Sequence, residues 1–259
     1  MRKKAIVLYE DGVHRCLMFD ALVSGDGVQS NQFLIEHGTF TAILDPGGDL
    51  TYTPLSMELS RHIDVKNLSY VLASHQDPDI ISSLDKWLLH THCQVVVSRL
   101  WERFLPHLMA SYLTLYQGIT ASDRIIALPD RGADIPFGDT VIKAIPAHFL
   151  HSVGNFHFYD PVSRILFSGD VGASMVPEAQ AVSDFSRHTV QMEGFHRRYM
   201  GGNKVCRLWA NMVRRLNPDK IVPQHGAWFE GENVGRFLDW IENLECGIDL
   251  LNQADYSIP

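Results

Sequence analysis

Hydrophobic and polar positions alternate along the chain with two different periods, which predicts a fold that mixes strands and helices. Short apolar runs that end at glycine or aspartate turns predict strands. These runs are 5–9, 16–19, 31–36, 40–44, 68–73, 94–97, 124–128, 140–146, 154–159, 164–168 and 220–223. Apolar residues at helical spacing predict helices. These segments are 54–62, 80–91, 101–116, 195–199, 204–216 and 231 to about 252.

The order of these elements predicts an α/β fold in which two sheets face each other. Each half of the chain begins with strands and continues with strands and helices. Elements in this order can bury their apolar faces as an αββα sandwich, with helices on both outer faces. Because 259 residues suffice for one core and no linker rich in Pro, Gly or Ser interrupts them, we expect a single domain over residues 1–259.

Charge and composition exclude several classes of protein. The formal charge of −8 argues against a nucleic-acid-binding protein, which usually presents a basic face. No apolar stretch approaches the roughly 18 residues of a membrane span. The first apolar run ends at Glu10 and Asp11, too early for a signal peptide, so a cytoplasmic protein is expected. The four cysteines form no C-x-x-C pair, which argues against zinc-ribbon or iron–sulfur sites.

Histidines and aspartates follow the ends of predicted strands at four places in the chain. These residues are His75, Asp77, Asp79, His148, Asp170 and His225. In the first group, residues two apart can face one side of an extended segment, and Pro78 favours an extended residue before it. Carboxylates gathered in this way repel each other unless a cation lies between them. The pattern therefore predicts a metal site, and two metal ions would lie about 3.5–4 Å apart.

The order of these motifs resembles the metallo-β-lactamase superfamily over nearly the whole chain, which implies the metallo-β-lactamase-type fold. Stretches 147–156, 196–200 and 222–226 are similar to those of the oxygen-binding di-iron proteins, relatives of the flavodiiron proteins that lack the flavodoxin domain. Two positions depart from the flavodiiron pattern. Asp77 stands where that family has Glu, and Ile80 stands where it has His.

The resemblance implies a role for each candidate residue. The first iron would be held by His75, Asp77 and His148, the second by Asp79 and His225, and both by a bridging Asp170. His151 and Tyr199 would line the pocket and contact a bound small molecule. Asp45 could orient a ligand histidine.

Two functions of different classes remain open at this point. Iron would make a site that binds or reduces dioxygen or nitric oxide. The chain shows no flavodoxin domain, rubredoxin-type cysteines or dinucleotide fingerprint, so such a site would need a separate electron donor or act as a sensor or carrier with a signalling partner. Zinc and manganese also fit these donors. A zinc site would make the protein a hydrolase of esters, thioesters or phosphoesters. A head-to-tail homodimer is implied by the resemblance alone.

Overall fold

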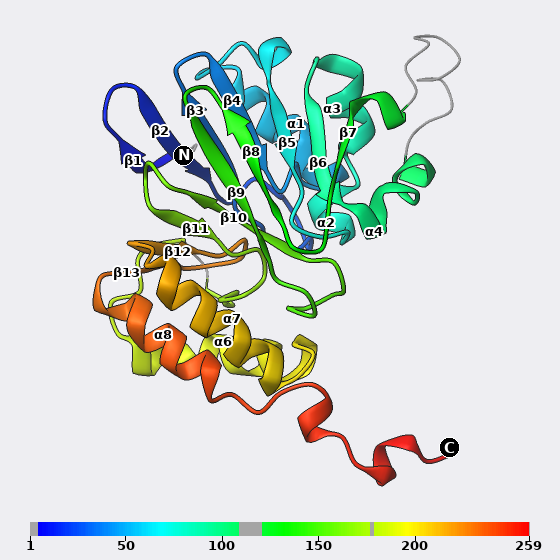
Figure 1. Cartoon of the computed structure of the whole chain (residues 1–259), viewed down its shortest axis with the longest axis vertical. Coiled ribbons are helices and arrows are strands. Elements are labelled where there is room, and N and C mark those ends of the chain that lie inside the picture. Colours follow the sequence, from blue (N-terminus) through cyan, green and yellow to red (C-terminus); the bar gives the residue numbers. More distant parts are fainter. Residues whose placement is uncertain (1–4, 109–120, 177–178, 259) are drawn as a thin grey trace.

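Two β-sheets lie face to face at the centre of the fold, as the alternation along the strands predicts (Figure 1). The computed structural model describes residues 5–108, 121–176 and 179–258. The strands of the first sheet lie in chain order. They are β1 (Ile6–Glu10), β2 (His14–Phe19), β3 (Gln32–His37), β4 (Phe40–Leu44), β5 (Tyr70–Leu72), β6 (Gln94–Ser98) and β7 (Ile125–Leu128). From β4 to β7 the neighbouring strands are parallel.

The second sheet is mostly antiparallel. Its order is β13-β12-β11-β10-β9-β8, and only β11 and β12 pair in parallel. The strands are β8 (Ala133–Phe137), β9 (Thr140–Pro146), β10 (Phe156–Asp160), β11 (Ile165–Phe167), β12 (Lys220–Val222) and β13 (Phe229–Glu230). Parallel pairing matters for the site, because it brings the carboxyl ends of neighbouring strands to one edge of a sheet.

Successive residues of one strand belong to different apolar layers, which shows how the alternation builds the sandwich. Met18 packs between the sheets with Phe158 and Phe167. Its neighbour Leu17 faces outward and packs with Leu55. Because side chains alternate along a strand, each sheet buries both of its faces.

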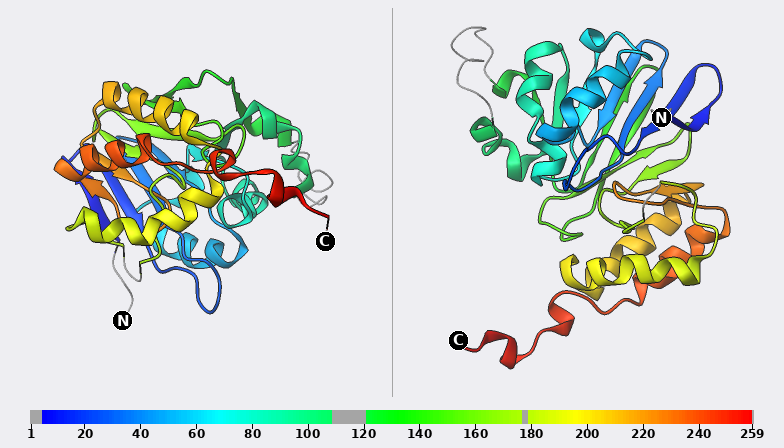
Figure 2. Two further views of the ribbon diagram at one scale, coloured as in Figure 1. Left: turned by 90° about the horizontal axis from the view of Figure 1, so that it is seen from below. Right: turned by 180° about the vertical axis from the view of Figure 1, so that it is seen from behind.

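Helices cover the outer face of each sheet (Figure 2). Those beside the first sheet are α1 (Asp49–Leu59), α2 (Pro78–Ile81), α3 (Leu84–His90) and α4 (Arg99–Glu102). Those beside the second are α6 (Phe185–Tyr199), α7 (Asn203–Leu216) and α8 (Glu232–Glu242). Single 3₁₀ turns are η1 (Val65–Asn67), η2 (Leu105–Leu108), η3 (Ala121–Arg124), η4 (Ile248–Leu250) and η5 (Gln253–Tyr256). The predicted αββα architecture is confirmed, while the extent of the domain over 1–259 stays a prediction.

Several predicted boundaries are wrong for identifiable reasons. The helix expected at 80–91 divides into α2 and α3, because the backbone N–H and hydroxyl of Ser83 both donate to the carbonyl of Gly47. Strand β8 was not predicted, since it contains Pro136, which sheets tolerate at an edge. The last helix ends at Glu242 and not near residue 252.

Two further helix predictions are only partly matched. Of the helix expected at 101–116, the residues up to 108 form the end of α4 and η2, and 109–120 lie outside the described residues. Helix α6 begins ten residues before the predicted segment 195–199, because its first turns are largely polar. Within the described ranges, no helix combines the length and apolarity that crossing a membrane requires.

Candidate metal centre

The candidate ligands meet where the carboxyl ends of the parallel strands reach one edge of the sandwich. His75 lies three residues after β5, Asp170 three residues after β11, and His225 three residues after β12. Strands β5 and β11 belong to opposite sheets. The site is therefore built between the two sheets, from rigid strand ends that hold side chains in place.

One group of donors gathers around the Oδ2 atom of Asp170. One donor atom from each of His75, Asp77, His151 and Asp170 lies within 4.8 Å of the others. Asp170 Oδ2 lies 3.0 Å from His151 Nε2 and 3.6 Å from His75 Nε2. Asp77 Oδ2 lies 3.4 Å and 3.8 Å from the same two nitrogens. Two imidazoles and two carboxylates thus surround one point.

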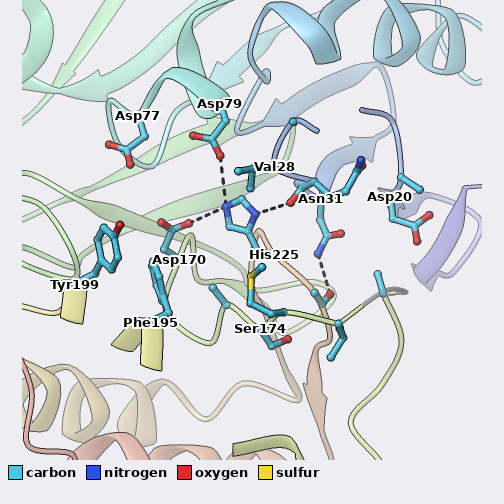
Figure 3. A pocket seen from close by; sticks show the side chains of 18 of the residues that line it. Asp20, Val28, Asn31, Asp77, Asp79, Asp170, Ser174, Phe195, Tyr199 and His225 are labelled. Carbon is cyan, nitrogen blue, oxygen red and sulfur yellow. Dashed lines mark hydrogen bonds and ion pairs between the residues drawn. The ribbon is translucent and has the colours of Figure 1, made fainter. Parts of the chain in front are cut away.

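The other oxygen of Asp170 faces a second group (Figure 3). Asp170 Oδ1 lies 3.3 Å from His225 Nε2, and that nitrogen lies 3.6 Å from Asp79 Oδ2. The two oxygens of one carboxylate thus point at two separate sets of donors. This arrangement is the one that a carboxylate bridging two metal ions requires.

Unpaired buried atoms show that this group of side chains fits metal ions. His75 Nε2 and Asp170 Oδ1 are buried and have no hydrogen-bond partner among the residues that the structure describes. Such atoms are costly to bury unless something binds them. The opposite nitrogens of two rings are already engaged, since His225 Nδ1 donates to the carbonyl of Gln29 at 2.6 Å and His75 Nδ1 hydrogen-bonds with Ser74 Oγ at 2.8 Å. These bonds leave both Nε2 atoms directed into the site, as outer partners of metal-binding histidines do.

The structure corrects one predicted ligand, because His148 lies outside both groups. Its Nε2–H donates to the carbonyl of Asp130 at 2.7 Å, and its ring packs edge-on against Phe156. The imidazole that faces Asp170 belongs to His151 instead. The prediction assumed that the first residues after a strand supply the ligand, but the imidazole that faces Asp170 comes three residues further along a tight loop.

Hydrogen bonds fold the loop between β9 and β10 so that His151 faces the site. Asn155 Nδ2 donates to the carbonyl of Leu150 at 2.6 Å, and the N–H of Leu150 donates to the carbonyl of Ala147 at 3.0 Å. Ser152 Oγ donates to Gln76 Oε1 at 3.0 Å, which ties the loop to the segment that carries His75. The sequence contained one signal for this role, the likeness of stretch 147–156 to the di-iron relatives.

The carboxylates control protonation in the absence of metal. Burial lowers the pKa of His151, but hydrogen bonds with Asp170 and Asp77 outweigh burial and raise its pKa to about 9. Burial likewise lowers the pKa of His225, and the Asp170 carboxylate raises it to about 9. Burial raises the pKa of Asp170, yet these two imidazoles hold it well below its usual value. The site therefore favours positive charge beside Asp170, which a metal cation also supplies.

Asp45 lies behind the site and not among the donors. Its side chain is buried, and its Oδ1 accepts a hydrogen bond from the backbone N–H of Ser74 at 2.7 Å. Burial raises its pKa to about 6, and the nearby His75 opposes this rise. Asp45 thus fixes the backbone next to His75, and the hydroxyl of Ser74 contacts the His75 ring directly.

A cavity of about 820 Å³ opens beside the two groups of donors. Its wall includes Phe195 and Tyr199 of α6, whose rings stack with centroids 4.8 Å apart. The Tyr199 ring also packs edge-on against His151 at 5.8 Å (Figure 3 shows Tyr199 and Phe195 on one side of the cavity). Both candidates for contact with a small molecule, His151 and Tyr199, therefore line this cavity.

A buried histidine on α6 holds the loop that follows Asp170. His196 Nε2 accepts a hydrogen bond from the N–H of Gly172 at 2.8 Å, and its Nδ1–H donates to the carbonyl of Met192 at 2.9 Å. Burial lowers its pKa to about 4 from 6.5, so the ring is neutral in the folded protein. In the sequence, His196 stands out only as the first residue of stretch 196–200, which resembles the di-iron relatives.

We expect the His196 ring to make the metal-free protein less stable in acid. The folded state binds fewer protons than the unfolded state, so the free energy of unfolding should fall as pH drops below 6.5 and level off near 4. The loss attributable to this ring is on the order of 3 kcal/mol. Urea unfolding of the wild type and of His196→Gln between pH 7 and pH 4 would measure it. An equally steep acid dependence in the variant would contradict the assignment.

Comparison with known proteins completes the identification. The sandwich, with histidines and aspartates at one edge of its strands, defines the chain as a protein of the metallo-β-lactamase class. A family model described as "ODP family beta lactamase" matches residues 28–226, and the chain belongs to this family.

Solved structures with related folds support this assignment. The chemotaxis sensor ODP from T. denticola, in its apo state, is 39% identical, with a TM-score of 0.83 over 95% of this chain and 97% of that one. A second structure, titled as the peroxy diiron species of the chemotaxis sensor ODP, is also 39% identical, with a TM-score of 0.84 over 96% and 98%. A flavo di-iron protein from Thermotoga maritima shares the fold at 20% identity, with a TM-score of 0.72 over 92% of this chain and 60% of that one.

Curated relatives are longer proteins. An uncharacterized protein of Methanocaldococcus jannaschii is 25% identical over 238 residues, which are 84% of this chain and 54% of that protein. A putative diflavin flavoprotein of Synechocystis matches over 100 residues at 27% identity, 38% of this chain and 17% of that protein. The chain thus spans about half the length of the first of these relatives and less of the second.

Proposed function

We propose that this chain is a di-iron protein that binds dioxygen at the site around Asp170 and acts as an oxygen sensor. The observation that carries the proposal is the placement of Asp170, whose two oxygens face separate sets of histidine and aspartate donors. The similar chemotaxis sensor ODP, described with a peroxy diiron species, supports iron and oxygen as the occupants. Nitric oxide is the second small ligand that such a site would accept.

The donor types favour iron over the metal of a hydrolase. In the proposed assignment His75, Asp77 and His151 hold one ion, Asp79 and His225 hold the other, and Asp170 bridges them. Three imidazoles and three carboxylates form a harder set than the sulfur-containing zinc sites. Three carboxylates leave a pair of ferric ions with net positive charge, which favours an anionic ligand. Iron would supply the electrons that the bound oxygen takes up.

The second metal position has room for an exogenous ligand. The residue after Asp79 is Ile80, which is fully buried in the apolar layer between the first sheet and its helices. It therefore offers no donor to the site. Among the described residues, Asp79, His225 and Asp170 are the donors proposed for this position, so open coordination sites would remain on the side of the cavity.

The cavity residues are proposed to contact the bound small molecule. Tyr199 carries the phenol nearest His151 among the residues that line the cavity, and Phe195 stacks on it. The Phe195 ring gives this side of the cavity an apolar wall, and the Tyr199 hydroxyl can donate a hydrogen bond to an anionic ligand. His151, placed as a ligand here, would act on the small molecule only through the metal.

Electron supply and output partners remain part of the proposal. Turnover at this site is proposed to depend on a separate electron donor. Without a donor, each oxygen molecule would be held and not consumed, which suits a sensor that signals to a partner protein. We also propose the homodimer that the resemblance implies. Analytical ultracentrifugation would test it.

Reconstitution with ferrous iron tests the proposal directly. The metal-free protein would be loaded with Fe²⁺ under anaerobic conditions and exposed to air while the visible spectrum is recorded. We expect about two irons per chain and a charge-transfer band that appears with oxygen. Slow decay of the band without a reductant would favour a sensor or carrier, and rapid decay with an added electron donor would favour a reductase.

Matched samples separate the alternatives. The zinc-loaded protein should stay colourless in air. A chain that takes up zinc but no iron, and that hydrolyses a thioester or phosphoester, would contradict the proposal and support the hydrolase. A coloured band that also forms in an Asp170→Ala variant would show that the colour arises elsewhere.

A further inference from the structure

Two cysteines that are 40 residues apart in the sequence are in direct contact. Cys206 lies on α7, and Cys246 lies in the segment that follows α8. Their sulfur atoms are 3.6 Å apart, and both side chains are buried. Because a disulfide has an S–S distance of about 2.05 Å, a movement of roughly 1.5 Å would allow the two sulfurs to bond.

The other two cysteines have different surroundings. Cys16 donates to Asp160 Oδ2 at 3.4 Å, and Cys93 accepts from Arg124 Nη2 at 3.8 Å. Neither hydrogen-bonds with another thiol in the part of the chain that the structure describes. All four cysteines are free. The Cys206–Cys246 pair is therefore distinguished by geometry, and the remaining two cysteines supply internal controls.

We propose that Cys206 and Cys246 form a redox site that hydroperoxides oxidise to a disulfide. The Cys246 thiolate attacks one oxygen of the hydroperoxide, the O–O bond breaks, and the other oxygen leaves as water or an alcohol after taking a proton. Cys246 is then a sulfenic acid. The Cys206 thiol attacks that sulfur, the S–O bond breaks, and water leaves as the S–S bond forms. Two thiols lose two electrons and two protons, and one hydroperoxide accepts them.

The surroundings of Cys246 suit the attacking role. The hydrogen bond between the two thiols lowers the pKa of the Cys246 thiol and raises that of Cys206. A thiolate is the reactive form of cysteine. Cys246 also lies just below the surface, because its neighbours Glu245 and Ile248 are exposed. Figure 1 shows the chain after α8 leaving the body of the protein toward the C-terminus.

Hydrogen bonds connect this segment to the loop that carries His151. Gly247 donates to the carbonyl of Arg197 on α6 at 2.9 Å, and Ile248 donates to that of Gly201 at 3.2 Å. Gly201 in turn donates to the carbonyl of Phe149, two residues before His151, at 3.0 Å. A disulfide between Cys206 and Cys246 would therefore restrain a backbone that leads to the metal centre, although the oxidation itself needs no metal.

Peroxide treatment of the metal-free protein tests the site independently of the di-iron proposal. With a small excess of hydrogen peroxide, the number of titratable thiols should fall from four to two. Peptide mapping should then show a disulfide between Cys206 and Cys246. The cross-link should also raise the thermal unfolding midpoint relative to the reduced protein. In Cys206→Ser, Cys246 should stop at the sulfenic acid, which a dione reagent labels. Cys246→Ser should leave Cys206 unlabelled, and Cys93→Ser should behave as the wild type.

Three outcomes would overturn the proposal. Native thiols that survive peroxide unchanged, while those of the urea-unfolded protein react, would show that the pair is closed to oxidants. A disulfide mapped to any other pair would assign the chemistry elsewhere. Equal labelling of Cys206 and Cys246 in the single variants would remove the distinction between attacking and resolving thiol. Because these samples contain no metal, failure of iron binding leaves each result interpretable.

Discussion

Replacing Asp170 with alanine should abolish binding of both metal ions. Its Oδ2 lies 3.0 Å from His151 Nε2, and its Oδ1 lies 3.3 Å from His225 Nε2, so one substitution removes a donor from both positions. It also removes the negative charge that lies between two histidines and attracts the incoming cations. Loss of an outer-sphere partner typically lowers metal affinity 10–100-fold, and loss of a bridging ligand should exceed about 100-fold.

Iron content and apparent affinity, measured on the reconstituted protein, check this expectation. Asp219→Asn provides a control, because Asp219 forms an ion pair with Arg164 at 3.0 Å away from the groups of donors. The control should retain its iron even if its melting temperature falls. An Asp170→Ala protein that is folded, as judged by circular dichroism, and still binds two irons would rule out the bridging role.

Substitution of His151 should abolish binding of one of the two metal ions, whereas substitution of His148 should leave both bound. His151 Nε2 faces both Asp77 and Asp170, while His148 binds the carbonyl of Asp130. We therefore expect His151→Ala to bind about one iron per chain and His148→Ala about two, with apparent affinity at the first position lowered by more than about 100-fold in the former.

The two variants form a matched pair, because both histidines lie on the same loop and both are replaced by alanine. Iron stoichiometry by elemental analysis, with the air-exposed visible spectrum of each variant, gives the result. Loss of iron in His148→Ala with full retention in His151→Ala would restore the assignment made from the sequence alone. Equal loss in both variants would point to collapse of the loop, which circular dichroism and thermal unfolding would reveal.

The sequence determined the architecture and most of the candidate site. Period-two alternation marks strands whose two faces are buried in different layers, as with Leu17 and Met18, and this property is local to each strand. Residues just after parallel strands converge by the rules of sheet geometry, so His75, Asp170 and His225 could be grouped before any coordinates were known. Charge and the absence of C-x-x-C pairs excluded other classes by composition.

Tertiary structure decided what depends on loops and on contacts between distant segments. Whether His148 or His151 faces Asp170 follows from hydrogen bonds within the β9–β10 loop, which no periodicity encodes. The start of α6 was not predicted because its first turns are polar, although Phe195 and Tyr199, which line the cavity, lie in the predicted segment 195–199.

Contacts between atoms that are distant in the sequence also depend on the tertiary structure. The carbonyl of Gln29 that orients His225 and the contact of Cys206 with Cys246 link positions 196 and 40 residues apart. A sequence pattern describes a residue and its neighbours, but the partner of such an atom is selected only when the whole chain packs. Local periodicity therefore determined the sandwich and the candidate residues at its strand ends, and long-range packing determined which of their atoms face one another.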